Sequence, residues 1–317
     1  MGAHPKKKKI KKKILLNLFI VFLIIPLVLE FFPAKYNNDY SLGQRLIDLC
    51  FGKIQTNEDY VEFFNVGQGD STLIKSDGAA VLIDFGVKSD NNKIYTNLLK
   101  YGIKSLDLAV ITHHHMDHMG DFLNLAEKIK IERLVINNNT AEDGEGEFYQ
   151  KVIQAAKKNG TEIISPKAGK VFEFGNAKLK ILNSCDFSEE ENNRSIALML
   201  TICGSKILFT GDGELEFEKL LSQRVNIDCD ILKMGHHGSA SSSSTQFLKA
   251  ASPKYAVASC GYDNLYGHPS DWAIERAKEQ GAVVLRTDLD RNIRFVFNNK
   301  NNTYTVKTER GKVYDNY

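Results

Sequence analysis

The chain has 317 residues, of which 43% are hydrophobic and 25% are charged, as in ordinary globular proteins. The formal net charge is +2, but seven lysines lie in residues 6–13, which leaves 34 basic against 39 acidic residues, about −5, for the rest. This acidic body weighs against a protein that binds nucleic acid through a broad basic surface. Five isolated cysteines without a C-x-x-C pair support neither a cysteine-based zinc module nor a redox motif.

The N-terminal lysines precede an apolar segment, residues 14–32, that is long enough to span a bilayer once. The positive-inside rule predicts a basic cytoplasmic tail (1–13), a transmembrane anchor (14–32), a linker (33–58) and an extracytoplasmic domain (59–317). The alternative is a cleaved signal peptide and a secreted protein. Cleavage requires two small residues, and Phe32 and Ala34 supply only one. We therefore expect a single-pass protein of the cell membrane.

Strands and helices are predicted along the rest of the chain. Short strands are expected at 61–65, 71–75 and 80–84, a helix at 94–101 and a buried strand at 108–112. Helices at 122–130 and 147–158 then alternate with strands at 134–137 and 161–164. Strands at 178–182, 196–203 and 206–210 precede a helix at 215–221 and a strand at 230–233, and the last strand is at 303–308. Strand groups interleaved with helices predict an α/β fold of four layers, with two face-to-face sheets inside and helices outside.

Seven of the eight histidines form three short groups, and the first group is the motif H-x-H-x-D-H. It consists of His113, His115, Asp117 and His118, directly after the buried strand at 108–112. Because alternate side chains of a loop point to one side, we expect His113 and His115 to bind one metal ion. Asp117 and His118 would bind a second ion, and His114 would point away.

Acidic and imidazole side chains also follow other predicted strands. Asp212 follows the strand at 206–210, where its carboxylate is expected to bridge two cations. His236 follows the strand at 230–233 and is expected to bind the second ion. Asp84 ends the strand at 80–84, where it would orient a ligand histidine without touching the metal. Asp70, in a G-Q-G-D turn, and His268, in a G-H-P turn, are candidate catalytic residues, as is Asp117.

These motifs resemble those of the metallo-β-lactamase superfamily. A narrower resemblance to the extracytoplasmic domain of ComEC-type competence proteins rests on residues 65–71, 193–195, 235–239 and 266–269. It covers residues 60–296 and implies an αββα sandwich with two divalent ions at the strand ends. Zinc is the default metal by ligand type, and manganese is the alternative. Asn193, Ser195 and His237 are expected around the ligands without binding the metals.

The chain departs from these families in two ways. The superfamily usually supplies a third histidine to the first metal, but the loop at 191–195 has none, and its asparagines are similar to the ComEC pattern. Competence channels have many membrane spans, whereas this chain has one predicted span. A separate channel protein is therefore the expected partner in any transport of DNA.

The apolar segment and the resemblance together predict a membrane-anchored, metal-dependent hydrolase that cuts a phosphodiester through a metal-bound hydroxide. DNA is a candidate substrate. One alternative is hydrolysis of a lactam, lactone or thioester on the same fold, although those reactions favour an apolar pocket and a complete histidine set. The other is an anchored metal-binding or partner module without catalysis.

Overall fold

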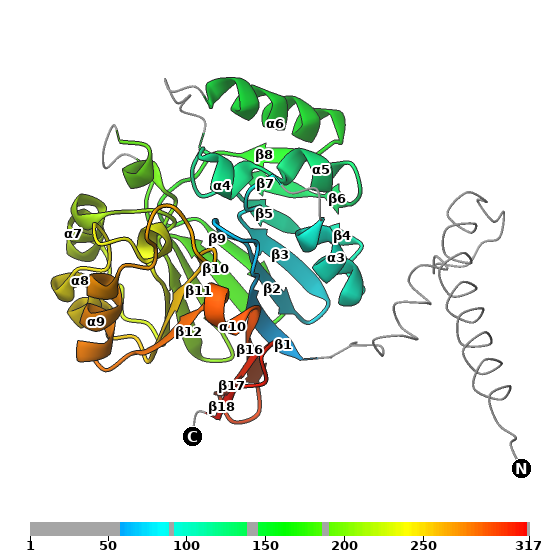
Figure 1. Ribbon diagram of the computed structural model, residues 1–317. Coiled ribbons are helices and arrows are strands. Elements are labelled where there is room, and N and C mark those ends of the chain that lie inside the picture. The colour runs from blue at the N-terminus through cyan, green and yellow to red at the C-terminus, as the bar shows by residue number, and fades with distance from the viewer. Residues whose placement is uncertain (1–57, 89–91, 138–144, 186–189, 316–317) are drawn as a thin grey trace, which may run out of the picture. The chain divides into compact units, whose positions relative to one another are not determined.

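The computed structural model describes residues 58–88, 92–137, 145–185 and 190–315 (Figure 1). Residues 56–98 and 103–317 group into one compact unit. The predicted tail (1–13), anchor (14–32) and, apart from Glu58, linker lie outside the described residues. Within the described ranges, no helix is both long and apolar enough to cross a membrane.

Two large β-sheets are formed by the described residues. The first has nine strands in the order β18-β17-β16-β1-β2-β3-β5-β7-β8, and the second has seven in the order β15-β14-β13-β12-β11-β10-β9. The strands of the first sheet are β1 (Asp59–Phe63), β2 (Thr72–Ser76), β3 (Ala79–Ile83), β5 (Leu108–Val110), β7 (Arg133–Val135), β8 (Glu162–Ile164), β16 (Ile293–Asn298), β17 (Thr303–Thr308) and β18 (Val313–Asp315). Those of the second are β9 (Val171–Phe174), β10 (Ala177–Ile181), β11 (Leu198–Ile202), β12 (Ser205–Phe209), β13 (Ile231–Lys233), β14 (Tyr255–Ala258) and β15 (Val283–Arg286). A small parallel pair joins β4 (Ser105–Leu106) to β6 (Lys130–Ile131).

The helices lie on the outer sides of the two sheets (Figure 1). Beside the first sheet are α3 (Lys93–Lys100), α4 (Met116–Met119), α5 (Phe122–Ala126) and α6 (Gly146–Lys158), and beside the second are α7 (Leu215–Arg224), α8 (Thr245–Ala251) and α9 (Asp271–Glu279). The short helix α10 (Thr287–Asp290) follows β15, a single 3-10 turn occupies Asn192–Arg194, and Gly235–Gly238 form a turn with two left-handed residues. Each strand and helix predicted between residues 61 and 233 is present, and so is the strand at 303–308. Most of these elements begin or end within a few residues of the predicted bounds.

The main hydrophobic core lies between the two sheets. It joins Val61, Phe63 and Val81 of the first sheet to Leu198 and Phe209 of the second, and all five are buried. The rings of Phe63 and Phe209 are 6.1 Å apart between centroids. Burying these faces against each other removes apolar surface from water on both sheets at once. The predicted face-to-face packing of the sheets is therefore confirmed.

A second core joins the seven-stranded sheet to its outer helices. Leu208 and Leu232 project from the sheet into a cluster with Phe217 of α7, Leu248 of α8 and Ala277 of α9. In β12, Leu208 faces this cluster while its neighbours Ile207 and Phe209 face the main core, as the two-residue repeat of a strand requires. The order of layers is helix, sheet, sheet, helix.

Parallel strands in both sheets place the candidate site. In the first sheet β3 pairs with β5 in parallel, and in the second β12, β13 and β14 are parallel neighbours. These strands are nearly continuous runs of buried apolar residues, which is typical of strands covered on both faces. Their carboxyl ends meet at a common edge, so the polar residues that follow each strand gather there.

Candidate metal centre

The H-x-H-x-D-H loop leaves β5 and continues into α4. His113 and His118 are buried, and Nε2 of His113 lies 3.1 Å from Nδ1 of His115. His114 is also buried but points away, since its Nε2 atom is 2.9 Å from the carbonyl oxygen of Asn137. The loop thus presents His113 and His115 as one pair and His118 as a separate donor, as the alternation of side chains predicts.

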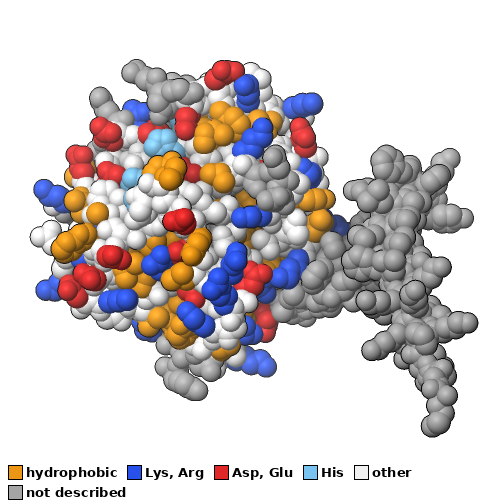
Figure 2. Space-filling model, in the orientation of Figure 1, with side chains coloured by type: hydrophobic (Ala, Val, Ile, Leu, Met, Phe, Trp, Pro, Cys, Tyr) orange, Lys and Arg blue, Asp and Glu red, His pale blue; other side chains and the backbone are white. Residues whose placement is uncertain are grey.

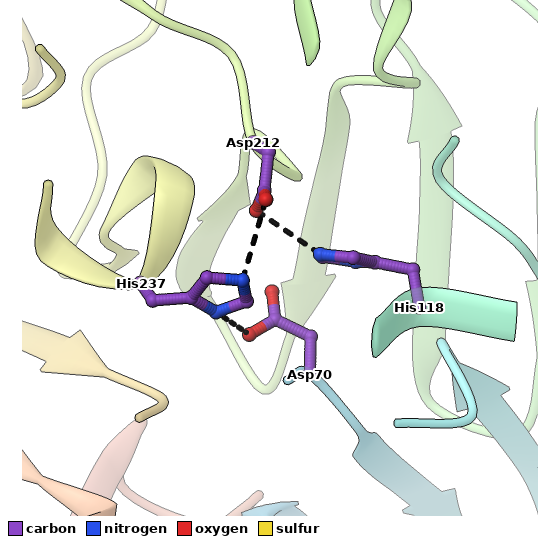
Figure 3. A group of neighbouring side chains, drawn as sticks. All are labelled: Asp70, His118, Asp212 and His237. Carbon is purple, nitrogen blue, oxygen red and sulfur yellow. Dashed lines mark hydrogen bonds and ion pairs between the residues drawn. The ribbon is translucent and has the colours of Figure 1, made fainter. Parts of the chain in front are cut away.

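Asp212 lies between the two groups of the histidine motif. It follows β12, is buried, and has one carboxylate oxygen 3.8 Å from Nε2 of His113. The other oxygen is 3.2 Å from Nε2 of His118. Asp212 Oδ2 is also 3.3 Å from Nε2 of His237 (Figure 3). A carboxylate in this position can bridge two cations.

His237, and not His236, faces this cluster. Its Nε2 atom lies 3.0 Å from Asp117 and 3.3 Å from Asp212. His236 turns to the other side, where its Nδ1 atom is 2.9 Å from Glu214. The sequence analysis chose His236 as the ligand and His237 as a supporting residue, and the structure places the two in the reverse positions.

The backbone explains why adjacent histidines point in different directions. His236 has φ 45° and His237 has φ 54°, so both occupy the left-handed region that side chains usually avoid. Such strained residues persist where the surrounding contacts hold them, and they are common at functional sites. Here Ser242 Oγ donates to the carbonyl oxygen of Gly235 at 2.6 Å. The position in sequence alone does not reveal this turn.

Two buried aspartates hold the ligand histidines from behind. Asp84 Oδ2 is 2.8 Å from Nδ1 of His118, and Asp70 Oδ1 is 3.1 Å from Nδ1 of His237. Asp84 also accepts a 2.7 Å hydrogen bond from the backbone N–H of Thr112. When a metal ion is bound, an acceptor at Nδ1 would keep the proton there and leave the Nε2 lone pair for the ion. Asp84 has the orienting position predicted for it.

Asp70, a predicted catalytic residue, lies in the buried cluster against His237 and Lys233 and is not among the residues that line the pocket. One atom each of Asp70, His118, Asp212 and His237 all lie within 4.8 Å of one another, a spacing compatible with ligands of one metal ion (Figure 3). Its turn requires Gly69, because a Cβ there would lie 2.4 Å from the carbonyl oxygen of Asp117. The backbone N–H of Asp70 donates to that same carbonyl at 3.1 Å, which joins the G-Q-G-D turn to the histidine loop.

Asn193 and Ser195 support the turn that carries Asp212. Asp212 donates its backbone N–H to Ser195 Oγ at 3.0 Å, and Glu214 donates its own to Asn193 Oδ1 at 3.0 Å. Glu214 Oε1 in turn lies 3.3 Å from Nδ2 of Asn192. The segment that lacks the usual third histidine therefore positions Asp212 and Glu214 through hydrogen bonds.

Lys233 and Glu214 were not predicted as site residues. Lys233 is the last residue of β13, is 2% exposed, and has its Nζ atom 2.5 Å from Asp70 Oδ2. The signal in the sequence was a lysine that ends an apolar strand, three residues before the histidine pair. Glu214 lies two residues after Asp212. Nothing in that spacing distinguishes Glu214 from an ordinary acidic residue in a turn.

Burial and opposite charges oppose each other in the pKa values of the cluster. Burial would raise the pKa of Asp212, but the imidazoles of His118 and His237 outweigh it and hold the pKa well below its usual value. Burial would lower the pKa of His118, yet Asp212 and Asp84 raise it well above the usual value. For His113, burial and the neighbouring His118 lower the pKa well below normal. Opposite charges thus favour ionised carboxylates at the centre.

The donor atoms fit divalent cations. The buried atoms His118 Nε2 and Asp212 Oδ1 have no hydrogen-bond partner of acceptable geometry within the described part of the chain, although they face each other. Buried polar atoms normally have partners, so two such atoms aimed into one cluster of imidazoles and carboxylates are the arrangement expected of metal ligands.

The cluster opens into a pocket of about 410 Å³. The pocket is lined by Gln68, Val87, His115, Met116, Asp117, Glu145, Asn192, Asp212, His236, His237, Tyr266 and His268. The ring of His268 lies 5.2 Å from that of His236 and 6.4 Å from that of His237, between centroids. His268 therefore lies at the pocket beside the cluster, and a substrate in the pocket would contact both.

Comparison with known proteins agrees with this geometry. The family described as Metallo-beta-lactamase superfamily matches residues 64–262. ComE operon protein 3 of Bacillus subtilis (strain 168) is 30% identical over 79% of this chain and 34% of its own length. Competence protein ComA of Neisseria gonorrhoeae is 31% identical over 83% of this chain and 35% of its own. The chain thus spans about a third of the length of these relatives.

A solved structure shares the fold at low sequence identity. CmlA, a diiron beta-hydroxylase from Streptomyces venezuelae, superposes with a TM-score of 0.50 at 14% identity, over 76% of this chain and 54% of its own. At this identity the likeness concerns the fold alone.

Proposed function

The chain belongs to the metallo-β-lactamase superfamily, and we propose that within it the protein is a two-metal phosphodiesterase or nuclease. The observation that carries the proposal is the position of Asp212, within 3.8 Å of His113 and about 3 Å of both His118 and His237. One carboxylate that faces two separate groups of donors is the arrangement a pair of cations requires.

We assign the metal ligands from these positions. His113 and His115 would hold the first ion, Asp117, His118 and His237 the second, and Asp212 both. When bound, the two ions would acidify a water molecule and neutralise charge on the phosphoryl oxygens. Zinc suits the imidazoles, and manganese is the alternative because the first group has no third histidine.

The remaining residues of the pocket would orient the substrate. Asp117 is 27% exposed, and its carboxylate faces the pocket beside His237. Burial would raise the pKa of Asp117, but the hydrogen bond to His237 and nearby positive charges hold it below its usual value. Asp117 thus remains an acceptor that can align the attacking water. His268 would donate a hydrogen bond to a phosphoryl oxygen or to the leaving group, next to His236, which Glu214 holds in place.

The competence relatives support a phosphodiester substrate, with DNA as a candidate. The test uses the full chain in detergent, loaded with zinc or manganese, against bis-p-nitrophenyl phosphate, single-stranded DNA and the lactam nitrocefin. We expect phosphodiester turnover that falls at least about a hundredfold in Asp212→Ala and His115→Ala. Turnover of nitrocefin alone would overturn the substrate class, and bound metal without any turnover would indicate a binding module.

We further propose that residues 14–32 anchor the protein in the cell membrane, with the catalytic domain outside and a separate channel protein as partner. The proposal rests on the seven lysines before that segment. A phosphatase that is active only outside the cytoplasm, fused after Val313, should be active. Activity of a cytoplasm-only reporter at the same position would contradict this orientation.

A further inference from the structure

An exposed aromatic ring lies at the edge of the metal pocket. Tyr266 is 71% exposed and is one of the residues that line the pocket. Its ring is stacked on that of His268, with 6.0 Å between centroids and 20° between planes. Figure 2 shows histidine side chains at the surface with hydrophobic side chains directly beside them. One face of a flat ring is thus available next to the place where the phosphodiester would bind.

The loop that carries Tyr266 is held in one conformation. Asn264 Oδ1 accepts hydrogen bonds from the backbone N–H groups of Tyr266 (3.2 Å) and His268 (3.0 Å). The Nδ2 atom of Asn264 donates to the carbonyl oxygens of Gly261 and His268. Gln68 Oε1 accepts from the backbone N–H of Gly261 at 3.1 Å and joins the loop to the G-Q-G-D turn. These bonds position the backbone at Tyr266, and the stack on His268 orients its ring, so the ring loses little freedom when a ligand binds to it.

The same loop exposes more apolar surface than its folding requires. Tyr262 is 78% exposed and Leu265 is fully exposed, so with Tyr266 three large hydrophobic side chains within five residues face solvent. Clustered exposed apolar side chains usually mark an interaction site. Of the three, Tyr266 lines the metal pocket, so its ring is the one that a substrate in the pocket can contact.

We propose that Tyr266, stacked on His268, binds the base of a nucleotide whose phosphodiester lies at the metal centre. This inference rests on the proposed function and names its substrate class. The acidic body, at about −5, cannot supply the broad electrostatic attraction on which nucleic-acid binding usually depends. Stacking does not depend on the charge of the protein, and any base offers a flat π face to an aromatic ring.

Two substrates with the same leaving group test this subsite in the metal-loaded full chain. Thymidine 5′-(p-nitrophenyl phosphate) carries a base, and methyl p-nitrophenyl phosphate does not. In Tyr266→Ala, we expect the ratio of kcat/KM for the nucleotide to that for the methyl ester to fall about tenfold. Tyr266→Phe should keep the ratio because it keeps the ring, and Tyr266→Leu should lose it. Tyr262→Ala is the matched control, since Tyr262 is exposed on the same loop but does not line the pocket.

An unchanged ratio in Tyr266→Ala, or an equal loss with both substrates, would overturn the inference while leaving the phosphodiesterase proposal intact. If Tyr266→Ala lowers kcat/KM more for p-nitrophenyl phosphorylcholine than for the thymidine ester, the ring binds a cationic ligand and the inference is overturned. If neither ester is hydrolysed, the proposed function fails. The base subsite is then tested by calorimetry, which compares the binding of thymidine 5′-monophosphate with that of methyl phosphate. Tighter binding of the nucleotide that Tyr266→Ala abolishes supports the subsite, and equal binding of the two ligands refutes it.

Discussion

The Nζ atom of Lys233 lies 2.5 Å from Asp70 Oδ2, so a buried ammonium balances the aspartate that holds His237. Burial would raise the pKa of Asp70, but Lys233 and His237 outweigh it and hold the pKa below its usual value. The second contact of Lys233 is its 2.8 Å hydrogen bond to the carbonyl oxygen of Met234. Lys233 therefore keeps Asp70 ionised behind the ligand histidine.

Replacing Lys233 by methionine should remove the ammonium that lies against the buried carboxylate of Asp70. Breaking a buried pair by removing one partner typically costs about 3–5 kcal/mol, and we expect this loss of unfolding free energy in the metal-free protein. The loss should be smaller with zinc, because bound cations then neutralise Asp70. Urea unfolding with EDTA and with zinc measures both values. Lys254→Met is the control, since Lys254 is 57% exposed in its ion pair with Asp230 and should cost less than about 1 kcal/mol.

The two adjacent histidines should differ in their effect on metal content. His237→Ala removes the imidazole that faces Asp117 and Asp212, so the variant should retain about half of the metal bound by the unaltered protein. His236→Ala should retain nearly all of it, because His236 contacts Glu214 instead. Elemental analysis after gel filtration measures the difference. Loss of metal in His236→Ala but not in His237→Ala would return the ligand role to His236.

Asp84→Asn should weaken metal binding without removing a ligand. An asparagine amide would direct an N–H toward Nδ1 of His118, which disfavours the tautomer whose Nε2 faces the cluster. Loss of such orienting groups typically lowers metal affinity about 10- to 100-fold. Competition with a zinc chelator measures the affinity. A zinc affinity within twofold of that of the unaltered protein would show that Asp84 only accepts hydrogen bonds from Thr112 and does not support metal binding.

Glu218 should make stability depend on pH. Its carboxylate is buried in α7 and accepts hydrogen bonds from the backbone N–H groups of Ser243 and Ser244. Burial raises the pKa of Glu218 from 4.5 to about 7, despite these hydrogen bonds. Because the folded protein binds this proton more tightly than the unfolded chain does, the contribution is present below pH 4.5 and is lost as the pH rises through 7.

Glu218→Ala should therefore lose the most stability near pH 5. The difference in unfolding free energy between this variant and the unaltered protein should narrow by up to about 3 kcal/mol by pH 8. Urea unfolding across this range measures the gap. Glu216→Ala, at an exposed position of the same helix, should show no such trend. A gap that widens with pH would mean that Glu218 is ionised in the folded protein throughout.

The order of layers could be predicted from the sequence because periodicity is a local property. Runs such as 108–112 and 230–233 are apolar and short, and each is followed by polar residues at the point where the strand ends. Parallel strands place these ends at one edge, so His113, Asp212 and the histidine pair could be expected to meet. The identity of the donors follows from residue type and position along each strand.

Which of two adjacent residues faces the centre was decided by the tertiary structure. His236 and His237 have the same side chain, and the left-handed turn that directs His237 inward is stabilised by contacts with distant residues such as Asp70 and Asp117. The partners of Lys233 and Glu214 are equally remote from any local pattern. The sequence shows which loop a residue lies on, because it shows where each strand ends. The direction of the side chain within that loop depends on packing and hydrogen bonds between residues far apart in the chain.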